Sequence, residues 1–418
     1  MDCKARIVVG PAATLHPAPF PVSPVPLYHR GVQPLSGIRV IEFCQIAAGP
    51  FCGMLLADLG ADVIKVESPE GDGMRQWPPL TRPASAPETP GYSENFASVN
   101  RNKRSVVLNL KDPADLAAAR ALCLAADVVL ENFRPGVMQR LGLGHETLAR
   151  EKPALVYCSI SAFGQEGPRA EEGGFDVTLQ AIGGVMSVTG EPDGAPVKSG
   201  VPLTDFAAGL YAAYAIAAAL RRAAASGEGA RIDVPMLGTT LAIAALQTSE
   251  YFGNGRDPVK LGSAHPRNAP YQAFRAKDGY FVMAAGNDDL YRRACEGIGR
   301  PALADDPRFA TTALRARNQV ELKDILEAVF ARHSAEECLA IMRRQGVPCA
   351  PINTYSAALA DPQVTHYGWV QPLELANGAR TRTFGSPLGK APPIRRRPPL
   401  LGEHTDEVLA ELGIRRTA

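Results

Sequence analysis

The sequence lacks the short motifs of several common enzyme chemistries. Its eight cysteines include no C-x-x-C pair, the spacing used by structural zinc sites and dithiol redox centres. Its seven histidines include no H-E-x-x-H motif, and no G-x-S-x-G nucleophile elbow is present. The turn Gln45–Pro50, which follows the first predicted strand, lacks the G-x-G-x-x-G fingerprint of nicotinamide and flavin enzymes. We therefore expect no metal ion and no tightly bound cofactor.

The sequence also lacks an excess of charge of one sign and a long apolar run. The 44 Lys and Arg residues nearly balance the 43 Asp and Glu residues, so the net charge is +1. This balance gives no support for nucleic acid or a membrane surface as a partner. No apolar run approaches the ~20 residues that a transmembrane helix needs. The scattered cysteines fit a reducing compartment, and we expect a cytoplasmic protein.

Proline is concentrated at the N-terminus. Seven prolines fall within residues 1–34, and this stretch has no apolar core of the secretory kind. We interpret it as a disordered or loosely packed extension. A transit peptide to the mitochondrial matrix is the less favoured alternative, because the prolines would interrupt an amphipathic helix.

The rest of the chain alternates between strand and helix patterns. At 418 residues it is too long for one ordinary core, so two domains are expected. An apolar run at 38–43, a helical pattern at 51–59 and an apolar run at 61–67 predict a βαβ unit with parallel strands. Further strands are predicted at 105–109, 127–130 and 153–161.

In an open parallel sheet, ligands bind beyond the carboxyl ends of the strands. The loops 45–50, 131–136 and 163–176 follow predicted strands and should therefore line one crevice. A long apolar helix begins near Asp205. Either Thr204 or Asp205 suits the cap of this helix, and Asp205 equally suits a nucleophile held at the helix start. The residues by themselves leave both interpretations open.

Seven blocks, in order along residues 35–413, carry a resemblance to a known family. The chain resembles the class III CoA-transferases, the family of formyl-CoA transferase and carnitine CoA-transferase. The blocks are Leu35–Glu42 with Ala48–Pro50, Leu59–Glu67, Asn102–Ser105, Glu131–Gly136, Thr189–Gly190, Thr204–Asp205 and Gly402–Thr405.

The resemblance implies an α/β fold, with a Rossmann-like large domain built on a parallel sheet and a smaller α+β domain. It also implies that two chains thread through one another as an interlocked homodimer. We place the first part of the large, CoA-binding domain at residues 35–254 and the small domain at 255–345. Residues 346–418 would return to the large domain and form the C-terminal tail, which we expect His404 to hold down.

The resemblance makes Asp205 the nucleophile of a CoA-transferase. Such an enzyme moves CoA from an acyl-CoA to a free carboxylic acid through an aspartyl mixed anhydride and an aspartyl-CoA thioester. An unperturbed aspartate pKa of ~3.9 would keep Asp205 ionised at neutral pH, so no general base is expected. The resemblance gives Asp176 a supporting role. The alternative for Asp176 is a cap on the helix that begins near Val177.

The resemblance also implies which residues contact CoA, as substrate and product. Ser68 stands where formyl-CoA transferase has a CoA-binding arginine. Arg134 and Arg140 suit phosphate groups, and Phe133 suits the adenine or the pantetheine arm. Solvated arginines and a core phenylalanine are the alternatives. The implied contacts are Ile46, Ala47, Ala48, Ser68, Leu108, Lys111, Asn132, Phe133, Arg134, Arg140 and Met236.

The loop Gly262–Pro266 replaces the poly-glycine substrate loop of formyl-CoA transferase. Ser263 and His265 are candidate substrate contacts, and His265 equally suits a turn before Pro266. With Arg267, the loop resembles that of the dicarboxylate-using branch. We therefore favour succinyl-CoA as donor and a dicarboxylate as acceptor.

Two other readings remain open at this point. An α-methylacyl-CoA racemase resembles the same fold, but it needs an acid–base pair at the substrate's α-carbon. Those racemases place a histidine directly before the position of Asp176, where this chain has Phe175, and that favours a transferase. A non-catalytic CoA-binding homologue is the second alternative, and the presence of Asp205 argues against it.

Overall fold

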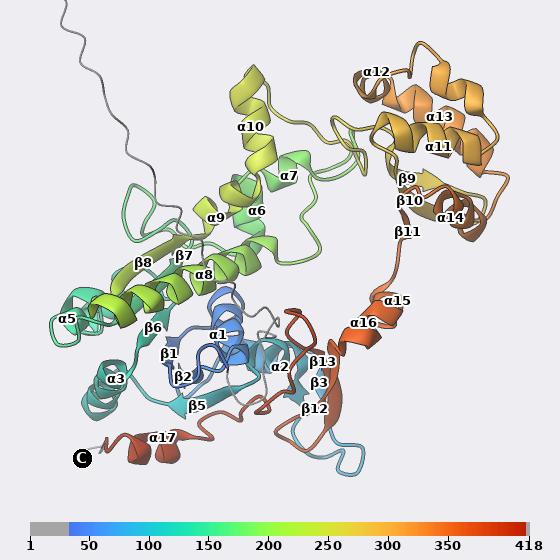
Figure 1. Ribbon diagram of the computed structural model, residues 1–418. Coiled ribbons are helices and arrows are strands. Elements are labelled where there is room, and N and C mark those ends of the chain that lie inside the picture. Colours follow the sequence, from blue (N-terminus) through green and yellow to red (C-terminus); the bar gives the residue numbers. More distant parts are fainter. Residues whose placement is uncertain (1–32, 415–418) are drawn as a thin grey trace, which may run out of the picture.

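The computed structural model describes residues 33–414. The predicted N-terminal extension, residues 1–34, lies outside this range except for its last two residues. The described chain forms a larger α/β body and a smaller α+β body that stands apart from it (Figure 1). Two connections join the bodies, one after α10 and one after β11 (Figure 1).

The larger body is built on a six-stranded sheet in which every pair of neighbours is parallel. The spatial order is β5-β2-β1-β6-β7-β8, so the chain winds outward from β1 first to one side and then to the other. This is the Rossmann order, with its switch point between β1 and β6. The predicted α/β fold with a parallel sheet is confirmed. The strands are β1 (Arg39–Phe43), β2 (Asp62–Glu67), β5 (Lys103–Val107), β6 (Val128–Glu131), β7 (Val156–Ser161) and β8 (Ala230–Pro235).

Helices cover both faces of the sheet, because successive residues of each apolar strand point to opposite sides. On β1, Val40 belongs to the core beneath α1 (Ala48–Asp58) and α8 (Leu203–Ser226). Its neighbour Ile41 belongs to the opposite core, beneath α3, α5 and α17. The bounds of these three helices are α3 (Pro113–Ala125), α5 (His145–Ala149) and α17 (Thr405–Glu411).

Helix α8 departs from two sequence expectations. It is 24 residues long and apolar enough to cross a membrane by length and composition, so the expectation that no stretch reaches this length is wrong. One side of α8 is nevertheless core, since Ala208, Ala212 and Ile216 are buried against the sheet. The helix crosses α1 closely at Gly209, where a Cβ atom would lie 2.8 Å from the Ala48 carbonyl oxygen. Such a helix is expected inside a globular protein, and its composition alone is weak evidence for a membrane.

The remaining helices and short strands of the larger body lie in the connections between the sheet strands and at the margins of the sheet. The apolar sequence from Met236 to about Phe252 favours a single helix, but the structure has two, broken at Ala244, where ψ is 27°. The elements are η1 (Gly73–Gln76), β3 (Leu80–Thr81), β4 (Tyr92–Ser93), α2 (Glu94–Asn100), α4 (Val137–Arg140), α6 (Asp176–Ile182), α7 (Val185–Val188), α9 (Met236–Ile243) and α10 (Ala245–Asn254).

The smaller body is a three-stranded antiparallel sheet covered by helices. The turn Lys277–Gly279 between two apolar runs predicts a hairpin. It is present, with Phe281 opposite Phe274, and both rings pack on Phe330. The third strand, β11 (Cys349–Pro351), pairs with β10, so this sheet extends past the boundary we placed at residue 345. The elements are β9 (Tyr271–Arg275), β10 (Tyr280–Ala284), α11 (Asp288–Gly297), η2 (Pro301–Asp305), α12 (Thr312–Arg317), α13 (Gln319–Phe330), α14 (Ala335–Arg344) and β11 (Cys349–Pro351).

The chain then returns to the larger body and runs along its sheet edge (Figure 1). It passes α15 (Tyr355–Leu359), α16 (Pro362–Tyr367) and the hairpin β12 (Val370–Glu374) and β13 (Arg380–Phe384). Beside β5, the Ser105 amide donates to His404 Nδ1 at 3.3 Å, and the Gly402 amide donates to Ser105 Oγ at 2.9 Å. The expectation that His404 holds the tail down is confirmed.

Candidate active site

Two cavities meet at the carboxyl ends of β1, β2, β6 and β7. One has a volume of about 420 Å³ and contains Asp205 in its wall. The other has a volume of about 310 Å³ and lies toward β2 and β5. They share Gln45 and Phe133, so together they form one groove across the switch point of the sheet. The predicted crevice is present, and the loops after β1, β6 and β7 contribute to it.

Most of the implied CoA contacts line this groove. The cavity at Asp205 contains Ile46, Ala47, Ala48, Asn132, Phe133, Arg134 and Met236. The second cavity contains Ser68, Leu108, Lys111 and Phe133. Arg140 lines neither cavity and is exposed at the end of α4.

Asp205 occupies the first turn of α8 and is partly buried. Burial raises its pKa from 3.8 to about 7, and the negative charge of Asp176 adds to the rise. Among residues 33–414, no cation lies within ion-pair distance of this carboxylate. The expectation of an unperturbed pKa is therefore wrong.

Asp176 holds the start of α8 in place. Its Oδ1 accepts hydrogen bonds from the backbone N–H and the hydroxyl of Thr204, both at 2.9 Å. Its Oδ2 accepts from Gln180 Nε2 at 2.7 Å. Neither Thr204 nor Asp205 caps α8 with its own side chain, and Asp176 does not cap the helix that it opens. Both capping expectations are wrong. The carboxylate that caps α8 is that of Asp176, which lies 28 residues before Thr204.

The loop after β1 has an unusual backbone conformation, and a side chain hydrogen-bonds to its backbone. Ile46 has φ of +66°, a left-handed conformation that branched residues rarely adopt. The side-chain amide of Asn132 exchanges two hydrogen bonds with Gln45, each of 2.9 Å. Asn132 therefore fixes the shape of this loop.

Residues after β7 complete the wall around Asp205. The Arg134 guanidinium packs on Gly173, where a Cβ atom would lie 3.2 Å from Nη2. At Gly174 a Cβ atom would lie 2.4 Å from Leu179 Cδ2, so glycine is required for the close approach of loop and helix. The loop 163–176 was predicted to line the crevice, but Phe175 and Glu172 within it were not among the expected substrate contacts. Phe175 is 73% exposed and lines it, and Glu172 does so while paired with Arg169.

The sequence profile of CoA-transferase family III matches residues 35–405. The chain belongs to this family. A succinate--glutarate CoA-transferase of Agrobacterium fabrum is 43% identical over 391 residues, which cover 92% of this chain and 97% of the relative. A succinyl-CoA:glutarate CoA-transferase of Homo sapiens is 37% identical over 393 residues, covering 92% and 87%. The crystal structure of a CaiB/BaiF family protein from Brucella suis matches with a TM-score of 0.80 at 38% identity, covering 91% of this chain and 100% of that chain.

The two joined cavities form a continuous groove that has Lys111 in the wall of one cavity and Asp205 in the wall of the other. The identification made from the seven motif blocks is confirmed, and so is the transferase class of the enzyme.

Ser263 and His265 line neither cavity of this chain. His265 Nδ1 accepts hydrogen bonds from the amides of Arg267 and Asn268, both at 3.1 Å, and Ser263 Oγ accepts from the Ala273 amide at 3.0 Å. Burial and the charge of Arg267 lower the pKa of His265, which suits a neutral acceptor. Within one chain, both residues shape the connection to the smaller body.

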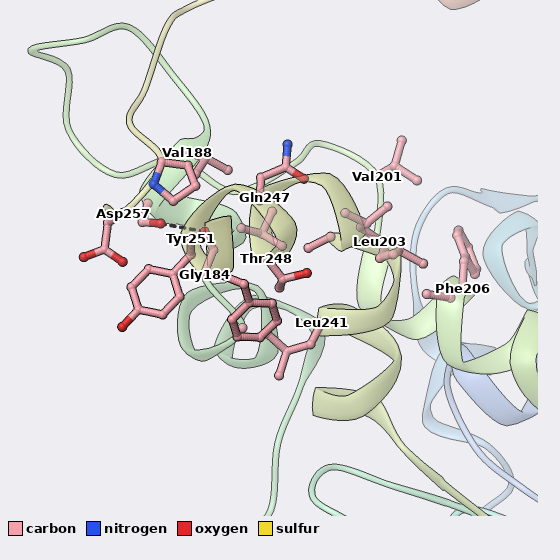
Figure 2. A pocket seen from close by; sticks show the side chains of 18 of the residues that line it. Gly184, Val188, Val201, Leu203, Phe206, Leu241, Gln247, Thr248, Tyr251 and Asp257 are labelled. Atoms are coloured by element: carbon pink, nitrogen blue, oxygen red, sulfur yellow. Dashed lines mark hydrogen bonds between the residues drawn. The ribbon is translucent and has the colours of Figure 1, made fainter. Parts of the chain in front are cut away.

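A third cavity, of about 660 Å³, lies on the other side of the first turn of α8. Figure 2 shows that its walls are mostly apolar, with Phe206 and Leu203 from α8 facing Leu241 and Tyr251 from α9 and α10. Phe252 and Tyr251 are exposed at its mouth, at 80% and 47%. This CoA-transferase therefore carries a large uncovered apolar surface next to its active site.

Proposed function

We propose that the enzyme moves CoA from succinyl-CoA to a free dicarboxylate such as glutarate, with Asp205 as the nucleophile. The names of the relatives support the substrates. The observation that carries the role of Asp205 is its position in the wall of the groove, partly buried and without a paired cation among the described residues.

In the first half-reaction, an Asp205 oxygen attacks the thioester carbonyl carbon of succinyl-CoA. The carbon–sulfur bond breaks, which leaves a mixed anhydride and the CoA thiolate. The thiolate then attacks the aspartyl carbonyl carbon, and succinate leaves with the electron pair of the broken carbon–oxygen bond. The product of this half-reaction is an aspartyl-CoA thioester.

The second half-reaction runs the same steps with the acceptor. A carboxylate oxygen of glutarate attacks the aspartyl thioester, which releases the CoA thiolate and forms a new mixed anhydride. The thiolate attacks the glutaryl carbonyl carbon, and Asp205 leaves as a carboxylate. The sum is succinyl-CoA plus glutarate giving succinate plus glutaryl-CoA, with no net proton transfer.

The environment of Asp205 suits these steps. A carboxylate of raised pKa is more basic and less solvated than a free aspartate, and both properties favour attack on a carbonyl carbon. Each attack develops an oxyanion, which backbone N–H groups of the Gly173–Gly174 loop and of the start of α1 are placed to stabilise. Phe206 and Phe51, whose ring centroids lie 4.6 Å apart, limit access of water from the α1 side.

The second cavity suits the nucleotide end of CoA. Lys111 and Ser68 lie at its far end and offer a cation and a hydroxyl to phosphate oxygens. Phe133, which lies in both cavities, is placed to pack on the pantetheine arm. Arg134 has no carboxylate partner among residues 33–414 and remains available to the ligand.

We also infer that the enzyme is an interlocked homodimer located in the cytoplasm. The 660 Å³ apolar cavity and the exposed Leu210, Tyr211 and Tyr214 of α8 are more apolar surface than a monomer usually leaves in water. Light scattering coupled to size exclusion tests the dimer, because a monomer at micromolar concentration would contradict it.

The function is tested by incubating the enzyme with succinyl-CoA and glutarate and measuring glutaryl-CoA by mass spectrometry. Asp205→Ala and Asp205→Asn should lower the exchange rate by at least ~10³-fold. Hydroxylamine added with succinyl-CoA should convert Asp205 to a hydroxamate. Exchange near the wild-type rate in either variant contradicts the mechanism. Uptake of deuterium at the α-carbon without CoA transfer would instead indicate a racemase.

The acceptor is tested by a screen with labelled succinyl-CoA. Succinate, glutarate, malate, itaconate, mesaconate and carnitine are offered one at a time at equal concentration. We expect dicarboxylates to be preferred over carnitine. A preference for carnitine would contradict the proposed acceptor class and leave the CoA-transferase assignment intact.

A further inference from the structure

A group of buried charges lies directly beneath the loop that follows β1, and the transfer steps do not use it. Glu42, Lys65 and Lys103 are 0% exposed and Asp72 is 1% exposed. Lys103 Nζ lies 2.8 Å from Glu42, and Lys65 Nζ lies 2.9 Å from Asp72. Burying ion pairs contributes little to stability, because desolvation offsets most of their attraction. These charges therefore call for another explanation.

Two members of the group bind the backbone of the loop. Lys65 Nζ donates to the Cys44 carbonyl oxygen at 2.6 Å. The Ile46 amide donates to the Asp72 carboxylate, at 3.1 Å to Oδ1 and 3.2 Å to Oδ2. Between them, Asn132 binds both backbone polar groups of Gln45. Every polar contact from the Cys44 carbonyl to the Ile46 amide is thus made by a side chain from another part of the fold.

The contact with Asp72 falls on the strained residue. Ile46 has φ of +66°, and a left-handed backbone is unfavourable for a residue with a Cβ atom. A charged acceptor makes a stronger hydrogen bond than a neutral one, so Asp72 is well suited to hold this conformation. Ile46 in turn lines the cavity that contains Asp205.

Asp72 is itself held rigidly. Its amide donates to Glu67 Oε2 at 3.0 Å, and Glu67 accepts from Arg75 at 2.7 and 2.8 Å and from Ser105 Oγ at 2.6 Å. Although burial opposes it, the hydrogen bond and charge of Arg75 help to lower the pKa of Glu67 to about 2, so Glu67 remains ionised. Ser105 also binds the C-terminal segment through Gly402.

We propose that Asp72 is a positioning residue for CoA, which holds the Gln45–Ala47 loop, through Ile46, in the backbone shape that binds the coenzyme. The inference rests on the proposed function in taking this loop as a CoA contact. It assigns a task to a residue that lies outside both cavities. It also gives a role to two buried charges of the block at 59–67, since Lys65 pairs with Asp72 and binds the loop, and Glu67 accepts from the Asp72 amide.

The test compares Asp72→Ala with Asp58→Ala. Asp58 is a matched control, since it is 6% exposed, pairs with Arg101 at 2.5 Å and sits at the opposite end of α1 from the loop. CoA alone is titrated calorimetrically, and kcat and KM are measured with succinyl-CoA. If the released loop leaves its binding shape, Asp72→Ala should weaken CoA binding and raise KM about tenfold, with kcat within about threefold of wild type. Asp58→Ala should leave both within about twofold of wild type.

A rescue separates positioning from general stability. Glycine adopts φ of +66° without steric cost, so Ile46→Gly should remove most of the need for Asp72. CoA affinity of the Asp72→Ala/Ile46→Gly double variant should lie within about threefold of Ile46→Gly alone. Failure of this rescue overturns the proposal, as does an unchanged affinity in Asp72→Ala or an equal loss in Asp58→Ala.

If Asp72→Ala does not fold, Asp72→Asn replaces it; the amide keeps the volume and an acceptor for the Ile46 amide but loses the charge, so the loss of CoA affinity should be smaller and in the same direction. The same three comparisons then decide. Calorimetry with CoA needs no acceptor, so a wrong assignment of the carboxylic acid leaves this test unaffected. Absence of CoA binding by the wild-type enzyme would contradict the proposed function instead.

Discussion

The pH at which kcat/KM for succinyl-CoA falls on the acid side should depend on the charge of Asp176 as well as on the pKa of Asp205. In the proposed mechanism only ionised Asp205 attacks the thioester, and burial raises its pKa to about 7 in the free enzyme. The rate constant kcat/KM for succinyl-CoA should therefore fall about tenfold per pH unit below pH 7 and be flat above it. The perturbation is Asp176→Asn, which removes the negative charge and keeps an oxygen that can accept from Thr204.

The size of the shift follows from the two causes of the raised pKa. The rise from 3.8 to about 7 spans 3.2 pH units, and burial is the larger cause. Asp176 therefore contributes less than half, and its removal should move the acid limb down by about one unit, or ~1.4 kcal/mol. The limb should then lie near pH 6, still well above that of a free aspartate.

The assay is rapid-quench formation of the aspartyl-CoA thioester from succinyl-CoA between pH 5 and 9, read by the mass of the intact protein. It does not depend on the ionisation of the acceptor. An unchanged limb in Asp176→Asn, with normal folding by circular dichroism, would refute the electrostatic argument. A wild-type profile that is flat from pH 5 to 8 would refute the raised pKa itself.

Three further predictions concern stability and binding. The pKa of Asp205 is higher in the folded than in the unfolded state, so the contribution of its protonation to stability is present at acid pH and is lost as pH rises through about 7. Asp205→Asn should thus stabilise the protein at pH 8 but not at pH 4. At pH 8 Tm should rise, and the free energy of unfolding measured with urea should rise by at most about 4 kcal/mol. Gly174→Ala should cost about 1–3 kcal/mol, because its Cβ would lie 2.4 Å from Leu179, whereas Gly238→Ala, with nothing closer than 3.7 Å, should be neutral or stabilising. Lys111→Ala should raise KM for succinyl-CoA several-fold and leave KM for glutarate unchanged; an equal change in both would contradict its place at the nucleotide end.

The parallel sheet and the crevice were predictable because both are written in local patterns. The apolar runs at 38–43 and 61–67 with a helix between them specify a βαβ unit, and the carboxyl ends of parallel strands meet at one edge. The resemblance then implied that Asp205 is the nucleophile, and the structure brings it to the groove at that edge. None of these steps requires knowledge of contacts distant in the sequence.

The errors share one physical cause, which is tertiary contact. The cap of α8 comes from Asp176, far upstream, so the local choice between Thr204 and Asp205 had no correct answer. The pKa of Asp205 depends on burial, which a sequence window does not report. The break at Ala244 carries no glycine or proline signal. Lys65 occupies a strand position that reads as an ordinary polar residue, yet it is fully buried.

The C-terminal segment covers β5, the outermost strand on its side of the sheet. The His404 amide donates to the Ser105 carbonyl oxygen at 2.9 Å, and the Asn102 amide donates to Arg396 at 2.9 Å, so this edge is already partnered. An exposed edge strand can pair with a strand of another chain, and proteins that leave such an edge uncovered tend to aggregate. Proteolytic clipping between residues 385 and 395 would uncover it. Covering this edge is thus a task of the C-terminal segment that is separate from the transfer of CoA.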